Sequence, residues 1–211
     1  MNGVLFNDTH SYYDLALILA PFTPAPAEPK TNYVDVPGAD GSLDQSEGLG
    51  EIKYHNRTLN FVFSVPHSVN YEEKITEVSN LINGKYFEKI TLDKDPEWYY
   101  SGRCKVDSYK SDRVSREIAI SATVFPYKFK QDETVVTLTG SEEYSVENSR
   151  QTVVPIIVTD SPIELSFNGI NYQLNAGTHK ILDVQLKEGA NVFKITPSSA
   201  VVTLTYQEGA L

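Results

Sequence analysis

The acidic residues before position 98 are the first group whose types and spacing could do chemistry. Asp93, Asp95 and Glu97 alternate along the chain, as carboxylates do at the start of a calcium-binding loop. The sixth position of that loop needs glycine but is Trp98, and the twelfth needs glutamate but is Cys104. The pattern therefore excludes an EF-hand and favours an acidic turn at the end of a strand.

Cys104 is the single cysteine of the chain, and a nucleophilic cysteine needs a neighbouring base. It lies in the alternating segment 103–109, which predicts a strand with Cys104 as a small buried hydrophobic residue. One cysteine cannot form an internal disulfide, and the four histidines lack the spacing of metal ligands. We therefore expect no catalytic residue, no cofactor and no bound metal.

Sequence motifs of enzymes give no stronger signal. Gly48-Leu49-Gly50 begins a dinucleotide-binding motif, but Lys53 stands where the third glycine should be. The chain contains no Gly-x-Ser-x-Gly, His-Glu-x-x-His or Walker sequence. A carboxylate pair for glycoside hydrolysis needs only proximity in space, which a sequence does not reveal. A glycosidase or peptidase therefore stays open as a possible function.

Charge and hydropathy restrict the partners. The 211 residues carry 18 basic and 28 acidic side chains, a net charge of -10, so we expect no specific binding of nucleic acid. The longest apolar run, Leu15 to Phe22, is too short to cross a bilayer, and we expect no membrane contact. Asp8 and Asp14 precede that run and no basic stretch does, so no signal peptide is expected.

Alternating apolar residues predict two strands, at 59–65 and 116–125, that face the same core. Between them, a three-to-four spacing of apolar residues predicts the one helix of the chain. Asn70 is its expected N-cap with Glu73 as partner, and Gly84 supplies the left-handed residue that ends it. We expect this helix to cover one face of a sheet.

Two segments before residue 52 are poor in groups to bury. Four prolines within 21–29 predict extended chain, and residues 37–41 have the composition of a turn. The polar segment 42–50 is either a mobile loop or a segment ordered by a partner. On the second interpretation, residues 36–51 form an arm that a neighbouring copy orders. The candidate oligomer interface then comprises Val36, Pro37, Gly38, Asp40, Gly41, Leu43, Leu49 and Ile52.

The texture of the chain changes near residue 130. Beyond it the sequence predicts short strands without a helix, and Asn168-Gly169 predicts a two-residue hairpin turn. This pattern indicates a β-sandwich, with a domain boundary within 128–132. The expected strands are 155–159, 163–167, 170–174, 179–182, 192–195 and 201–206.

Taken together, these segments resemble the distal tail protein (Dit) family of long-tailed bacteriophages, which are hub proteins of the tail tip. The resemblance rests on "GVLFNDTHSYYDLALIL", "VPGADGSLD", "RTLNFVF", "LINGKY", "LDKDPEWYYSGR" and "FPYK", and is clearest over residues 1–128. "INYQLNAGTHKI", "EGANVFKI" and "VTLTYQEGAL" are similar to the galectin-like sandwich that many members carry. The family-motif residues are Asp95, Trp98, Tyr99, Tyr100, Gly102 and Arg103.

The resemblance implies a mainly β protein with one helix and two domains. Residues 1–130 would form a β-sandwich or barrel-like ring-forming (belt) domain, and residues 131–211 a galectin-like β-sandwich. It implies a structural virion protein and no enzyme, located at the tail tip of the baseplate after synthesis in the host cytoplasm. Members form hexameric rings that join the tail tube protein to the tail-tip lysin or fibre and to receptor-binding proteins, and DNA passes through the channel without specific binding.

Two matters stay open at this point. Trp98 and Tyr100 suit either core packing or an interface, because a strand buries every second side chain. A carbohydrate-binding module for adhesion to the host surface is the alternative function. Galectin sugar sites generally need His, Asn, Arg and Trp on one sheet face. Residues 131–211 hold one arginine (Arg150), one histidine (His179) and no tryptophan, which weighs against sugar binding by this domain.

Overall fold

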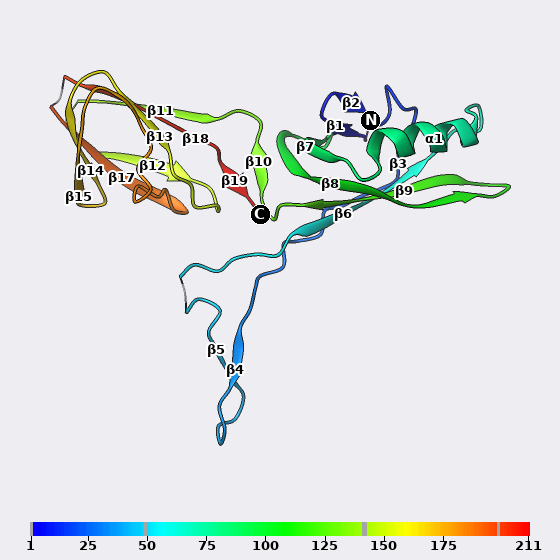
Figure 1. The fold of residues 1–211 in the computed structure, drawn as a ribbon, viewed down its shortest axis with the longest axis horizontal. Helices are drawn as coiled ribbons and strands as arrows, with labels where there is room; N and C mark the ends of the chain where they lie inside the picture. Colours follow the sequence, from blue (N-terminus) through cyan, green and yellow to red (C-terminus); the bar gives the residue numbers. More distant parts are fainter. Residues whose placement is uncertain (1, 49, 141–142, 198) are drawn as a thin grey trace. The chain divides into compact units, whose positions relative to one another are not determined.

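The computed structural model describes residues 2–48, 50–140, 143–197 and 199–211. The chain divides into two compact units (Figure 1), one that runs to Lys128 and includes Leu211, and one from Phe129 to Ala210. Each unit has its own cluster of buried apolar residues. No helix in the described ranges is long and apolar enough to cross a membrane.

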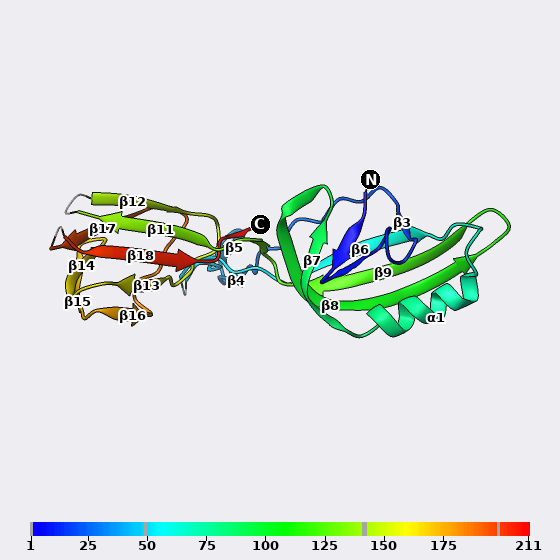
Figure 2. The same cartoon turned by 90° about the horizontal axis from the view of Figure 1, so that it is seen from above.

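The first unit is built on an antiparallel sheet with the strand order β2-β1-β7-β8-β9-β6-β3. Figure 2 shows its central strands β6, β9 and β8 side by side, with α1 beside β8. The elements are β1 (Val4–Phe6), β2 (Thr9–His10), β3 (Ile18–Leu19), β6 (Arg57–Ser64), α1 (Tyr71–Ile82), β7 (Tyr86–Leu92), β8 (Asp95–Ser111) and β9 (Arg116–Val124).

The predicted alternation of β6 is confirmed, because buried and exposed side chains alternate over its whole length. Phe61 and Phe63 are fully buried, and Phe61 meets Phe6 of β1 edge-on at 6.1 Å between ring centroids. β9 pairs with β6 in continuous register, from Arg57 opposite Val124 to Ser64 opposite Glu117. The buried side chains of these two strands form a large part of the core of the first unit.

Helix α1 begins and ends close to where the sequence predicts. The side chain of Asn70 accepts a hydrogen bond from the Glu72 amide, rather than pairing with Glu73 as expected. Gly84, just beyond the C-cap, has a φ of 76°, the left-handed conformation that glycine adopts freely. Val78 and Ile82 are fully buried against the sheet, so the helix covers the core.

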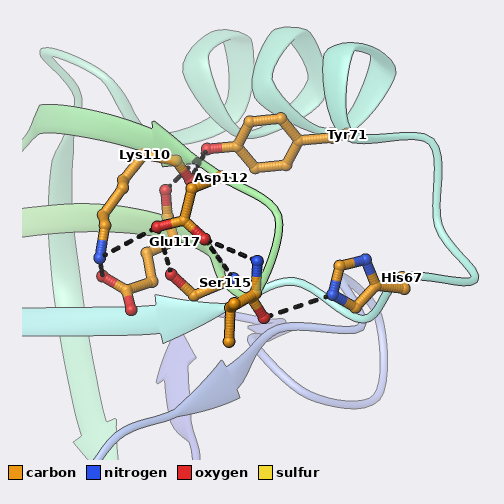
Figure 3. Close-up of polar contacts among 7 residues, drawn as sticks. His67, Tyr71, Lys110, Asp112, Ser115 and Glu117 are labelled. Carbon is orange, nitrogen blue, oxygen red and sulfur yellow. Dashed lines mark hydrogen bonds and ion pairs between the residues drawn. The ribbon is translucent and has the colours of Figure 1, made fainter.

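The tip of the β8–β9 hairpin is held by polar contacts to the start of α1 (Figure 3). The Tyr71 hydroxyl lies 2.8 Å from the carbonyl oxygens of Lys110 and Glu117, one on each strand, and can donate to either. Asp112 Oδ1 accepts from the amides of Ser115 and Val114 and so orders the turn. The hydrogen bonds from these two amides also keep the pKa of Asp112 below its usual value.

The second unit is a sandwich of two four-stranded antiparallel sheets, with orders β11-β18-β13-β16 and β12-β17-β14-β15. Apolar residues from both sheets meet in one cluster, for example Leu204 from the first sheet and Phe193 from the second. The strands are β11 (Thr134–Thr139), β12 (Glu143–Asn148), β13 (Ile156–Thr159), β14 (Ile163–Phe167), β15 (Ile170–Leu174), β16 (Gly177–His179), β17 (Gly189–Thr196) and β18 (Val201–Tyr206). The short β19 (Gly209–Ala210) pairs with β10 (Lys128–Lys130).

Most strands expected after residue 130 are present, with one correction. Asn168 and Gly169 have φ of 48° and 83° and join β14 to β15 as the predicted hairpin turn. The strand expected at 179–182 is wrong, because β16 ends at His179 and the pairing with β13 involves residues 177–179. β11 and β12 were not expected as strands.

Candidate oligomer interface

The arm of residues 28–55 is a hairpin of its own. Within the described part of the chain, its strands β4 (Tyr33–Asp35) and β5 (Ser42–Asp44) pair only with each other, with Val34 opposite Leu43. At the base, Pro29 bridges to Tyr54, and backbone hydrogen bonds of 2.7–2.8 Å join Lys30 to Lys53 and His55 to Glu28. Within the segment 42–50, the described residues thus form a strand at 42–44 followed by a turn at 46–48.

The loop that joins β4 to β5 uses two residues in the left-handed region. Gly38 and Gly41 have φ of 84° and 75°, and the Ala39 amide donates to the Val36 carbonyl at 3.1 Å. Side chains other than glycine are strained in this region. The predicted turn within 37–41 is therefore present and has a physical reason for its glycines.

Asp44 orders the return strand of the arm. Its Oδ1 accepts from the Ser46 hydroxyl at 2.5 Å and from the Ser46 amide at 2.9 Å, and the Ser46 hydroxyl oxygen in turn accepts from the Asn32 amide. The hydroxyl bond, followed by the amide bond, lowers the pKa of Asp44 from its usual value. These contacts connect the two strands without burying any apolar group.

The arm exposes nearly all of its side chains. Every residue from Glu28 to Gln45 is exposed, including Val36, Pro37, Gly38, Asp40, Gly41 and Leu43 of the expected interface. Ile52 is half-buried, and Leu49 lies outside the described residues. Tyr33 and Val34 of the same hairpin are 60% and 40% exposed and were not among the expected interface residues, because their strand buries no face that spacing could reveal.

Val34 and Leu43 form an apolar pair on one face of this two-stranded ribbon. They stand opposite each other in the register, and Leu43 is 52% exposed. Cross-strand partners project to the same face, so both side chains are presented together. An isolated two-stranded hairpin is marginal in water, and contact with another sheet is the usual way to stabilise it.

The family-motif residues lie on β8, where they brace the first unit. Tyr100 is buried, and the guanidinium carbon of Arg57 lies 5.4 Å from the centroid of its ring. Burial raises the pKa of the Tyr100 hydroxyl, although the nearby Arg57 acts in the opposite direction. Arg57, itself 7% exposed, donates to the carbonyl oxygens of Ala25 and Pro126. Tyr100 is thus a core residue, and the open question from the sequence is answered for it.

Asp95 and Trp98 share one cation. Lys128 Nζ donates to Asp95 Oδ2 at 2.6 Å and lies 5.0 Å from the centroid of the Trp98 ring. Tyr99 contacts a different cation, the Lys89 ammonium, at 5.0 Å. Trp98 and Tyr99 are half-buried, so these contacts hold the side chains of two consecutive strand positions in place.

Gly102 and Arg103 complete the motif. A Cβ on Gly102 would lie 2.2 Å from the Thr123 carbonyl oxygen on β9, so only glycine allows β8 and β9 to approach here. Arg103 Nη1 donates to the Gly84 carbonyl oxygen at 2.5 Å, which ties β8 to the end of α1. The family-motif residues therefore hold β8 against its neighbours in the first unit.

The remaining side chains that could take part in catalysis or metal binding have structural roles. Cys104 is fully buried, and its burial raises the pKa of the thiol to about 12, as expected of a structural cysteine. His10 Nε2 and Asp93 Oδ1 are 3.0 Å apart and join β2 to the turn between β7 and β8. Within the described ranges, no group of three or more His, Cys, Asp or Glu side chains could hold a metal ion.

The two polar residues considered for sugar binding have local partners. Arg150 Nη1 donates to the Glu188 carboxylate, and His179 Nε2 lies 2.7 Å from the Asn175 carbonyl oxygen. Both side chains are thus engaged within the second unit. Sugar binding by this unit stays an untested alternative.

Comparison with known proteins places this geometry among solved folds. No protein-family model and no curated protein matches the chain. A solved structure does match, the crystal structure of the SPP1 Dit (gp 19.1) protein, described as a paradigm of the hub adsorption apparatus in phages that infect Gram-positive bacteria. This chain is similar in fold to SPP1 Dit. The match has a TM-score of 0.68 at 13% sequence identity, and covers 98% of this chain and 99% of that one.

The similarity to SPP1 Dit confirms the expected mainly β fold over nearly the whole chain. A second solved structure, a de novo designed double-stranded β-helix, matches 37% of this chain. Its TM-score of 0.27 is too low to indicate a shared fold. The galectin-like character of the second unit stays a prediction.

Proposed function

We propose that this chain is a distal tail protein, a structural hub of a phage tail tip that assembles as a hexameric ring. The observation that carries the proposal is the match in fold to SPP1 Dit, which includes both units and nearly all of each chain. The first unit would be the ring-forming (belt) domain, and the second a galectin-like platform. The tail tube protein, the tail-tip lysin or fibre and receptor-binding proteins are the proposed partners, and DNA would pass through the channel without specific binding.

The exposed hairpin of residues 28–55 favours assembly into a ring. It presents Val34 and Leu43 on one face, and among the described residues no further strand pairs with the outer edges of β4 and β5. Strand addition to a neighbour's sheet would satisfy the backbone groups on those edges and bury the apolar pair. Because the arm of each copy would contact the next copy, the contact is heterologous and closes a ring when the rotation fits.

The mass of the assembly that the full chain forms in solution tests whether it makes a hexameric ring. We expect a species of six copies of the 23.6 kDa chain, about 142 kDa, by light scattering at high concentration. Leu43→Asp should shift this species to smaller masses, because a carboxylate would be buried in the contact. Negative-stain images of the same sample should show rings.

Ile170→Asp is the matched control for Leu43→Asp. Ile170 is 59% exposed and also lies on a hairpin, but in the second unit, so its substitution should leave the mass unchanged. A monomer at every concentration, both alone and in isolated tail tips, would contradict the proposal. Equal effects of the two substitutions would show that the arm is not the contact.

A further inference from the structure

The outward strand positions of one sheet of the second unit carry no charge, and the exposed Asp160 and Lys180 stand just beyond the ends of β13 and β16. Outward positions on β11, β18, β13 and β16 are valine, isoleucine or threonine, and they align in rows across the strands. Figure 2 shows these four strands side by side. The residues of this uncharged face are Val135, Thr137, Thr139, Ile156, Val158, Thr178, Val201, Thr203 and Thr205.

The face is accessible. Val135 is 59% exposed, and Ile156, Val158 and Val201 are between 38% and 41% exposed. β-branched side chains have few rotamers to lose, so fixing them in a contact costs little entropy. An exposed face of this kind is suited to docking.

The opposite face of the sandwich differs in charge. Outward positions of β12, β17 and β14 include Glu143, Glu147, Glu164 and Lys194, and Glu143 stands opposite Lys194 in the register. A sheet face in contact with water normally carries such charges. The composition of the uncharged face is therefore a property of that face and not of the whole unit.

We infer that the uncharged face binds the same face of a second copy of this chain. Residues 129–210 hold five basic and ten acidic side chains, a net charge of -5, so two copies repel each other through most of their surfaces. The uncharged face is where two copies can meet without opposing like charges. Two aligned sheets pack face to face about 10 Å apart, and a two-fold axis makes the contact self-complementary.

The contact is small. Nine side-chain positions, spaced about 4.8 Å between strands and about 6.8 Å along them, give roughly 300 Å² per copy, against about 800 Å² in a standard interface. One pair of faces therefore associates weakly. Covalent trapping is a better readout than equilibrium mass for such a contact.

Cysteine trapping on the full chain tests the inference. Val158→Cys places a thiol on the central strand β13, and mild oxidation should give disulfide-linked dimers. Val192→Cys is the matched control, since Val192 is 42% exposed against 40% for Val158 but lies on β17 of the opposite sheet. Cys104 is buried and does not compete.

We expect the dimer yield of Val158→Cys to exceed that of Val192→Cys at least fivefold. Adding Thr203→Lys should abolish the excess, because two lysines would face each other across the contact. The excess should persist in the Leu43→Asp chain, which separates this contact from the arm. Equal yields, or loss of the excess with Leu43→Asp, would overturn the inference, and circular dichroism confirms that each variant is folded.

Discussion

Arg57 shows how one residue can organise a core without any chemistry. It is 7% exposed, and its guanidinium satisfies two carbonyl oxygens while lying over the Tyr100 ring. A buried cation is costly unless its donors find acceptors, and here they do. The charged and aromatic residues around β8 are therefore explained by folding, which agrees with the proposed structural role.

Gly102 is the position of this motif that should tolerate substitution least. Gly102→Ala would place a Cβ against the Thr123 carbonyl oxygen, and separating β8 from β9 should cost about 3 kcal/mol of unfolding free energy. Urea denaturation measures the loss. Lys105→Ala, at an exposed position of the same strand, is the control and should change stability little. A Gly102→Ala chain of unchanged stability would mean that the strands can separate at no cost.

At the scale of elements, tertiary contacts decide the positions of long hairpins. β8 and β9 extend beyond the core, and their tip depends on Tyr71 at the start of α1 and on the Asp112 turn. A shift of register occurs between Val106 and Ser108, which lets the far part of the hairpin follow the helix. The hairpin is thus positioned by α1.

Tyr71→Phe should measure this contact. Removing the hydroxyl leaves two carbonyl oxygens with one partner fewer, and we expect a loss of about 1 kcal/mol in unfolding free energy. Tyr13→Phe is the control, because Tyr13 is 73% exposed. Hydrogen exchange at the hairpin tip should rise in Tyr71→Phe alone, and an unchanged exchange rate would contradict the role of the hydroxyl.

Glu208 should make the stability of the second unit depend on pH. Desolvation acts to raise its pKa, but hydrogen bonds from the Thr134 hydroxyl, from Ser149 at 2.7 Å and from Lys130 at 3.0 Å together outweigh it and lower the pKa. A lowered pKa gives stability that is present above the unfolded pKa, near 4.5, and is lost as the pH falls through the folded pKa.

Glu208→Gln should therefore cost about 1 to 2 kcal/mol at pH 7 and progressively less below about pH 4.5. Thermal unfolding of both chains between about pH 3 and pH 7 measures the difference. Glu143→Gln, at an exposed carboxylate of β12, is the control. A difference that does not shrink in acid would show that the charge of Glu208 is not responsible.

Whether an element was predictable depended on where its stability comes from. β6 and α1 bury one face each, so Phe61, Phe63, Val78 and Ile82 reveal them by spacing. The arm buries no face, so β4 and β5 left no such signal and were missed as strands. The burial of Tyr100 depends on Arg57, which is far away in sequence, and no local pattern contains that contact.

At the scale of the whole molecule, the two units have separate cores. A core of its own is what allows a unit to fold alone. The independence of the two units in folding can therefore be tested directly.

Residues 129–211 should fold as an isolated fragment. The fragment contains both sheets and the Lys130–Glu208 contact, and should show a cooperative thermal transition. A shorter fragment, 134–211, loses β10 and should be about 1 kcal/mol less stable. A fragment 129–211 without a transition would show that its sheets need the first unit.

The pairing of β10 with β19 also has a mechanical consequence. The second unit starts at one of these strands and ends at the other, and the Lys130 amide donates to the Glu208 carbonyl oxygen between them. A pull applied between residues 128 and 210 therefore loads this short pair first. The two sheets of the sandwich lie outside the path of the force, so the pair can open while the sandwich stays intact.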